Sequence, residues 1–133
     1  MKTSELTGKP LDWAVAKCED ERDVLFCQRQ YGRLLVRTPG DHETHDSEWV
    51  YTPSTDWAQG GPIIEREKFT VMYDDDWKYD PTDPEDNGER WMADNGDSYY
   101  NPTQYGATPL IAAMRFYVAS KLGDDVDVPE WVK

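Results

Sequence analysis

The strongest constraint on the fold is a capped helical pattern near the C-terminus. Thr108 is a residue type favoured just before a helix. Pro109 suits the first helical position, because its ring fixes φ near the helical value and the N–H that proline lacks would have no partner within the helix there. Apolar residues then recur at helical spacing from Leu110 to Leu122, and Gly123 ends the pattern. The sequence therefore predicts a helix over 109–122, packed against a sheet.

A second, shorter helix is predicted near the N-terminus. Pro10 lies where a helix can begin. After it, apolar positions recur at intervals of three and four residues: Leu11, Ala14, Val15 and Cys18. This spacing is typical of an amphipathic helix with one buried stripe.

Several short runs between the two helices have the composition of β-strands, at 33–37, 48–52, 68–73 and 90–93. In the third run Phe69, Val71 and Tyr73 alternate with other residues, as in a strand with one buried face. We expect hairpins, not β-α alternation, to link these runs. We expect one α+β domain over residues 1–133, with a small antiparallel sheet of three to five strands packed with the N-terminal and C-terminal helices.

The charge balance excludes some classes of partner. The 133 residues include 27 acidic and 14 basic ones, a formal net charge of −13 at pH 7. Such a surface is repelled by nucleic-acid phosphates and by anionic lipid, so we expect neither direct nucleic-acid binding nor membrane binding. With no hydrophobic signal region at the N-terminus, we expect a cytoplasmic protein whose two cysteines are reduced thiols.

Residues 74–97 form the most acidic stretch of the chain. Ten Asp and Glu residues meet Lys78 and Arg90 there, among prolines and an Asn87-Gly88 turn signal. One interpretation is a solvated, loop-rich insertion. The alternative is a surface whose carboxylates imitate DNA phosphates, anchored by the aromatic residues Trp77, Tyr79, Trp91, Tyr99 and Tyr100.

Three strings of the sequence resemble the phage NinX family. They are Asp-Trp-Ala-Gln-Gly-Gly-Pro-Ile-Ile (56–64), Trp-Met-Ala (91–93) and Thr-Pro-Leu-Ile-Ala-Ala-Met-Arg (108–115), and the region 2–18 is also similar. The family comprises small proteins of tailed phages and prophages, and it brings no established activity with it. The resemblance implies a phage accessory protein acting in the cytoplasm of the infected bacterium. Segments 22–48 and 74–90 do not contribute to it, and we interpret them as insertions.

The resembling strings suggest a ligand pocket. Gly60-Gly61-Pro62 offers backbone without side-chain bulk, and Trp57 or Trp91 could stack on a planar ring. Arg115, close to the apolar face of the C-terminal helix, would balance an anion. The residues assigned to this pocket are Asp56, Trp57, Gly60, Gly61, Pro62, Trp91, Thr108 and Arg115.

A structural interpretation of the same residues stays open. Arg115 would then pair with an internal carboxylate such as Asp56 or Glu65. In that case Gly60-Gly61-Pro62 makes an ordinary turn into a strand, and the tryptophans belong to the core.

Metal and catalytic patterns are weaker. The run 41–46 holds His42 and His45 among carboxylates, but in a loop and not as His-Glu-x-x-His on a helix, so we interpret it as a solvated loop. The run 83–88 begins like a calcium loop and then lacks the glutamate at the twelfth position, which favours a turn. Cys18 and Cys27 lack a context that would activate a thiol. We expect no metal, no cofactor and no identifiable catalytic residue.

Two functions follow from these patterns. The first is capture of an anionic, nucleotide-like small molecule in the pocket, which would blunt a host defence pathway. The second is inhibition of a basic host protein by the acidic surface, including imitation of DNA. A small enzyme is a third alternative.

Overall fold

The computed structural model describes residues 1–19, 25–30, 33–38, 47–75, 80–84, 86–96 and 102–133. In this part of the chain the elements are η1 (Thr3–Glu5), α1 (Gly8–Cys18), β1 (Leu25–Gln30), β2 (Arg33–Thr38), β3 (Ser47–Val50), α2 (Trp57–Glu67), β4 (Thr70–Tyr73), β5 (Trp91–Asp94), β6 (Gln104–Gly106) and α3 (Pro109–Leu122). The class is α+β, as predicted. None of the helices seen here combines the length and the apolar character that crossing a membrane requires.

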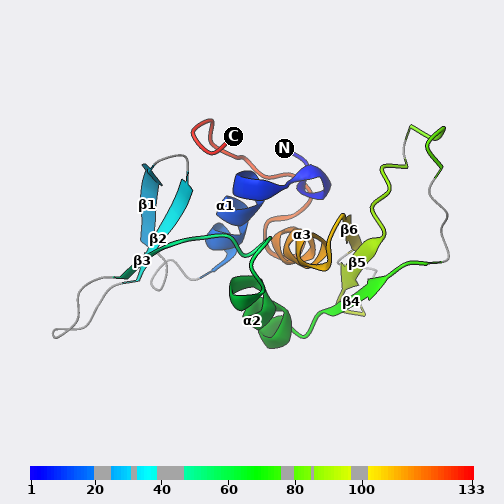
Figure 1. Ribbon diagram of the computed structural model, residues 1–133, viewed down its shortest axis with the longest axis horizontal. Helices are drawn as coiled ribbons and strands as arrows, with labels where there is room; N and C mark the ends of the chain where they lie inside the picture. The colour runs from blue at the N-terminus through cyan, green and yellow to red at the C-terminus, as the bar shows by residue number, and fades with distance from the viewer. Residues whose placement is uncertain (20–24, 31–32, 39–46, 76–79, 85, 97–101) are drawn as a thin grey trace.

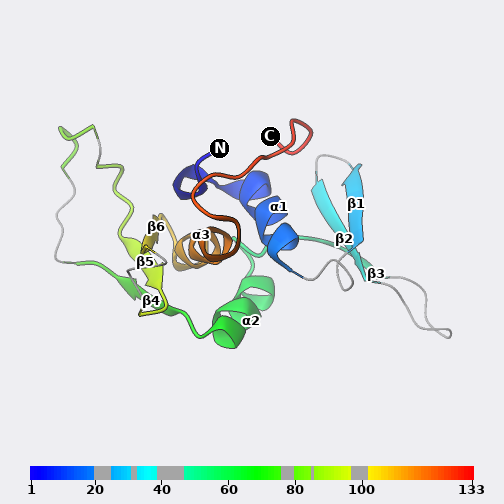
Figure 2. The same ribbon diagram turned by 180° about the vertical axis from the view of Figure 1, so that it is seen from behind.

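Helix α3 lies at the centre of the molecule, with α1 on one side and the sheet β4-β5-β6 on the other (Figures 1 and 2). Leu110 and the run from Ala112 to Val118 are all buried. A helix buried around its whole circumference belongs to a core, which explains why the predicted helix carries so few charges. Strand β6 approaches α3 so closely that a small residue is needed between them. A Cβ at Gly106 of β6 would lie 2.5 Å from the backbone nitrogen of Ala112, so only glycine fits there.

The sheet β4-β5-β6 is antiparallel, and its two faces differ. In one cross-strand row Val71 pairs with Ala93, which is fully buried beneath α3. In the next row Met72 pairs with Met92, which in turn pairs with Tyr105. Since successive residues of a strand point to opposite faces, this second row lies on the face away from α3. The predicted strands at 68–73 and 90–93 are confirmed as β4 and β5, and β6 was not predicted.

The second sheet, in the order β1-β2-β3, lies beyond α1 on the side opposite to β4-β5-β6 (Figure 1). Leu35 of β2 pairs with Val50 of β3. Leu34 and Tyr51 are buried, and they join this sheet to the core. The predicted strands at 33–37 and 48–52 are confirmed, whereas β1 was not predicted. The strands thus divide between two three-stranded sheets.

The expectation of a turn at Gly60-Gly61-Pro62 was wrong, because these residues lie inside helix α2. Asp56 starts the helix by accepting a hydrogen bond from the Ala58 backbone N–H at 3.0 Å. Lys68 ends it with a left-handed backbone conformation, at φ 58°. Local glycine and proline signals favour a turn, but capping at Asp56 and packing against the core favour the helix.

Packing also explains the glycine at position 60. Gly60 is buried where α2 meets the segment before it. A Cβ at this position would lie 2.3 Å from the Pro53 carbonyl oxygen and 2.7 Å from Leu110 Cδ2. The helix can therefore approach the core this closely only with glycine at position 60.

Candidate functional site

Arg115 is a buried cation in the central helix, with a side chain 2% exposed. Its Nε donates to the carbonyl oxygen of Leu6 at 2.8 Å. Its Nη1 donates to Glu89 Oε2 at 2.8 Å and to the carbonyl oxygen of Tyr105 at 2.7 Å. The guanidinium therefore joins three separate parts of the chain: the N-terminal segment, the connection between β4 and β5, and strand β6.

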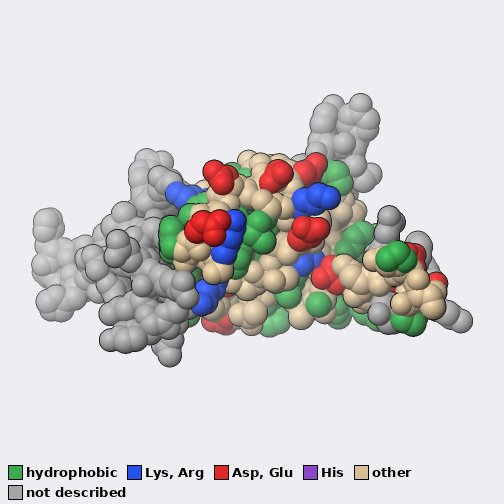
Figure 3. Space-filling model, turned by 90° about the horizontal axis from the view of Figure 1, so that it is seen from above, with side chains coloured by type: hydrophobic (Ala, Val, Ile, Leu, Met, Phe, Trp, Pro, Cys, Tyr) green, Lys and Arg blue, Asp and Glu red, His purple; other side chains and the backbone are tan. Residues whose placement is uncertain are grey.

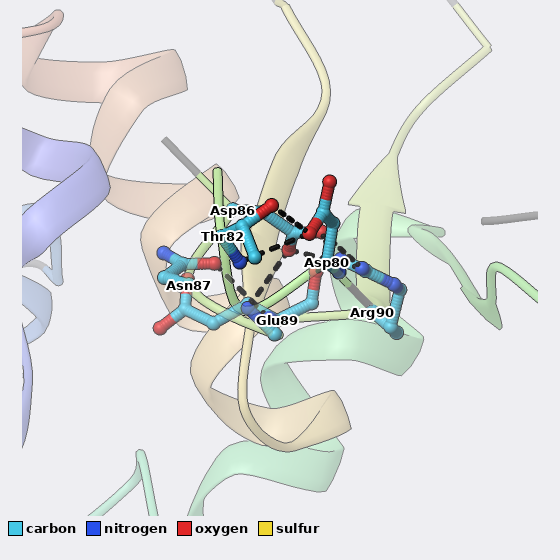
Figure 4. A network of polar contacts seen from close by, with 7 residues as sticks. Asp80, Thr82, Asp86, Asn87, Glu89 and Arg90 are labelled. Atoms are coloured by element: carbon cyan, nitrogen blue, oxygen red, sulfur yellow. Dashed lines mark hydrogen bonds and ion pairs between the residues drawn. The ribbon is translucent and has the colours of Figure 1, made fainter. Parts of the chain in front are cut away.

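The connection that supplies Glu89 has an ordered polar network at residues 80–90 (Figure 4). Asp86 is its centre. One carboxylate oxygen accepts from the Asp80 backbone N–H at 2.8 Å and the other from the Gly88 backbone N–H at 3.1 Å. Arg90 Nη2 lies 2.9 Å from both oxygens. These bonds favour the charged carboxylate, so Arg90 above all, with the backbone donors, lowers the pKa of Asp86 to about 2.

Hydrogen bonds between residues close in the sequence extend this network at both ends. Thr82 donates from its hydroxyl and its backbone N–H to Asp80 Oδ1, at 2.6 Å and 2.9 Å. The Glu89 backbone N–H donates to Asn87 Oδ1 at 3.0 Å. The side chains of Asp80 and Asn87 each accept a hydrogen bond from the backbone N–H two residues further on, which stabilises a turn at each place. The described part of the acidic stretch is therefore a structured loop, which we call the acidic loop (residues 80–84 and 86–90).

A hollow of about 600 Å³ lies between the acidic loop, the N-terminal segment and strand β6. Its lining residues are Ser4, Glu5, Asp74, Asp83, Asp86, Asn87, Glu89, Arg90, Thr103, Gln104 and Tyr105. Five carboxylates and one guanidinium in this lining leave four negative charges, or three when Arg115 behind Glu89 is counted. We call this feature the acidic hollow. Acidic and basic side chains lie scattered, among uncharged and apolar surface, over the face that carries both termini (Figure 3).

The sequence model of the family described as Bacteriophage P22, NinX matches residues 2–121. The chain belongs to this phage family. Membership supports the role of a phage accessory protein. A search among curated proteins found no match. The matched range includes Arg115, Glu89 and the whole lining of the acidic hollow. It also runs through segments 22–48 and 74–90, which the resembling strings do not cover.

Within the NinX-family string at 56–64, the structure places the predicted site residues along helix α2. Asp56 is the N-cap, and its second oxygen also accepts from Gln59 at 3.2 Å. Trp57 is 57% exposed, and Pro62 is exposed as well. Gly61 lies beside the Trp57 ring, where an added Cβ would meet Cε3 at 3.8 Å. Gly60 and Gly61 therefore form part of a helix and not a loop of open amides.

The remaining predicted residues lie on strand β5 and at or within helix α3. Trp91 on β5 packs against the core and stacks edge-on with Tyr73 at a ring distance of 5.2 Å. Thr108 caps α3 by accepting from the Ile111 backbone N–H at 3.1 Å. Arg115 pairs with an internal carboxylate, as the structural interpretation expected, but that carboxylate is Glu89 and neither Asp56 nor Glu65. Among the residues that the structure describes, α2 supplies Arg115 with no hydrogen bond.

Among the other candidate groups, those that the structure describes show no arrangement for chemistry. Cys18 is a free, partly buried thiol, and burial, together with the neighbouring charge of Glu19, raises its pKa to about 12. A neutral thiol of this kind is a poor nucleophile. The histidine-containing run 41–46 lies outside the described residues, and so does the side chain of Cys27. The described residues contain no group of three or more His, Cys, Asp or Glu side chains able to hold a metal ion.

Sequence reasoning missed Glu89 and the acidic hollow as parts of one site. Glu89 was one of ten acids in a stretch interpreted as either solvated or mimicking DNA. A usable signal was Arg115 itself, because a buried guanidinium requires an internal acceptor. The sequence does not indicate which of 27 carboxylates supplies it.

Proposed function

We propose that this NinX-family protein acts by binding a basic protein of the host or the phage at the acidic hollow. The observation that supports this is the lining, in which five carboxylates meet a single guanidinium that already bonds to Asp86. A Lys or Arg side chain entering such a hollow gains charge-assisted hydrogen bonds. An acidic surface of this kind also raises the rate of encounter with a basic partner.

The order of the acidic loop favours binding over simple solvation. Asp86 and Glu89 are held by Arg90, Arg115 and backbone N–H groups, so they are in place before a partner arrives. Groups that are already fixed lose little conformational freedom on binding. A purely solubilising face needs no such network.

Capture of an anionic, nucleotide-like molecule is less well supported. Arg115, the cation assigned to that ligand, is occupied by Glu89 and two carbonyl oxygens. A phosphate placed in the acidic hollow would be repelled by roughly 4 kcal/mol for each unneutralised carboxylate at about 4 Å. We therefore favour the basic protein as the partner, with obstruction of a host factor as the biological consequence.

The test is recovery of the protein from phage-infected cells, followed by native mass spectrometry. We expect a basic protein to be retained and to be released as the salt concentration rises. Neutralising two hollow residues, Asp74→Asn with Asp83→Asn, should remove it. The matched control is Glu65→Gln with Asp127→Asn, which changes the net charge equally at exposed positions outside the hollow.

Two results would count against the proposal. One is equal retention of the partner by the hollow variant and the control variant. The other is retention of a small anion in place of a protein, which would support the nucleotide hypothesis.

A further inference from the structure

A row of apolar side chains on the outer face of the sheet β4-β5-β6 adjoins the acidic hollow. The row consists of Met72, Met92 and Tyr105, which are cross-strand neighbours. Met72 is 49% and Tyr105 43% exposed, although both are large hydrophobic residues. Helix α3 packs on the opposite face, where Val71 and Ala93 point. The row therefore presents apolar surface to solvent.

The row and the acidic hollow are continuous. Tyr105 belongs to both. Asp74 follows Met72 by two positions, and Arg90 precedes Met92 by two. The Asp74 backbone N–H donates to the Arg90 carbonyl oxygen at 2.8 Å, which extends the pairing of β4 with β5 to these two residues. Because side chains two residues apart in a strand share a face, the apolar row borders the hollow residues Asp74 and Arg90 directly.

The length of the row matches the spacing of apolar residues along one face of an α-helix. Three neighbouring strands place the first and third residues of a row about 10 Å apart, at roughly 4.8 Å per strand. Apolar residues at positions i, i+4 and i+7 of an α-helix span about 10.5 Å. Methionine side chains are flexible, so they adapt well to such a helix.

We infer that the outer face of β4-β5-β6 receives a basic amphipathic helix of the partner protein, with its apolar stripe on Met72, Met92 and Tyr105. Its Lys or Arg side chains then reach the acidic hollow. The inference rests on the proposed function and adds the shape and chemistry of the partner segment. Charge complementarity selects this occupant, since the hollow attracts a basic helix. A second copy of the chain carries a formal charge of −13 and would be repelled.

The experiment uses two synthetic peptides of equal positive charge as probes. In the first, lysines and leucines lie on opposite faces of a helix; in the second, serines replace the leucines. We expect the leucine peptide to bind the full-length protein about tenfold more tightly than the serine peptide. The double variant Met72→Ser with Tyr105→Ser should lose this preference and bind the two peptides with equal affinity.

A matched control removes equally exposed apolar side chains elsewhere. Trp57 is 57% and Leu122 41% exposed, and neither lies on this sheet. The variant Trp57→Ser with Leu122→Ser should keep the preference for the leucine peptide. Because all four positions are exposed, we expect both variants to fold, and thermal unfolding checks this.

Different failures separate the inference from the proposed function. Equal affinity of the two peptides, or an unchanged preference in the Met72 and Tyr105 variant, overturns the helix inference while charge-dependent binding stands. A leucine peptide that stays non-helical when bound, by circular dichroism, also overturns it. If the protein self-associates and the Met72 and Tyr105 variant abolishes this, a second copy of the chain occupies the row and the helix inference is overturned. Peptide binding that is unaffected by Asp74→Asn with Asp83→Asn contradicts the proposed function itself.

Discussion

Replacing Arg115 by methionine tests the central ion pair of this protein. Methionine fills a similar volume but has no donor for Glu89 or for the carbonyl oxygens of Leu6 and Tyr105. Breaking one partner of a buried ion pair costs ~3–5 kcal/mol. Glu89 is 18% exposed, so water partly solvates it once it is released, and we expect the lower part of that range. Urea unfolding followed by tryptophan fluorescence measures the change in the free energy of unfolding.

The contribution of the pair itself comes from a double-mutant cycle. Glu89→Gln keeps an acceptor oxygen but removes the charge that balances Arg115. If the pair acts as a unit, the double variant should be more stable than the sum of the two single losses predicts, by ~1–3 kcal/mol. A loss below ~1 kcal/mol in Arg115→Met, or additive single effects, would refute this account. Should Arg115→Met fail to fold, Arg115→Lys gives a milder version of the same cycle.

The remaining predictions concern the core. Burial raises the pKa of Asp12 to about 6, so this carboxyl binds its proton more tightly in the folded protein than in the unfolded chain. Protonation of Asp12 therefore stabilises the folded state increasingly as the pH falls from 7 towards 4. Asp12→Asn should therefore flatten the pH dependence of unfolding by up to ~3 kcal/mol across this interval, whereas a profile identical to the wild type would contradict the burial argument. Gly60→Ala should destabilise by ~1–3 kcal/mol, because the new Cβ would overlap the Pro53 carbonyl, as urea unfolding will show. Gly61→Ala is its control, since the added Cβ makes an ordinary contact and the helix gains up to ~1 kcal/mol. Equal effects of the two alanines would show that packing does not set the difference.

The elements that sequence reasoning predicted are those with local signals. Helix α3 has its cap, its proline and its terminal glycine within a single segment, so no distant contact is needed to recognise it. Helix α2 was missed for the opposite reason. Its Gly60 and Pro62 argue locally against a helix, and the reason for Gly60 is a contact with Pro53 and Leu110 that the sequence does not display.

The candidate site divides in the same way. Arg115 was recognised because a guanidinium near an apolar helix face requires a partner. Its partner Glu89 lies 26 residues away, in the stretch 74–97 that holds ten acidic residues, so no pattern singles it out. The apolar row was missed because it needs the register of β5 with β6, and β6 is only three residues long. Long-range pairing, and not propensity, determines both features.

Arg115 also determines how binding and folding can be told apart in this protein. It joins the acidic loop to the central helix, so any change at Arg115 or Glu89 alters stability and the shape of the acidic hollow together. Loss of binding in such a variant is therefore ambiguous. Asp74 and Asp83 line the same hollow, and neither contributes a side chain to the Arg115 bonds. Their neutralisation changes the field in the hollow while the ion pair behind it is preserved, and for this reason the binding experiments should use these two residues and the folding experiments Arg115.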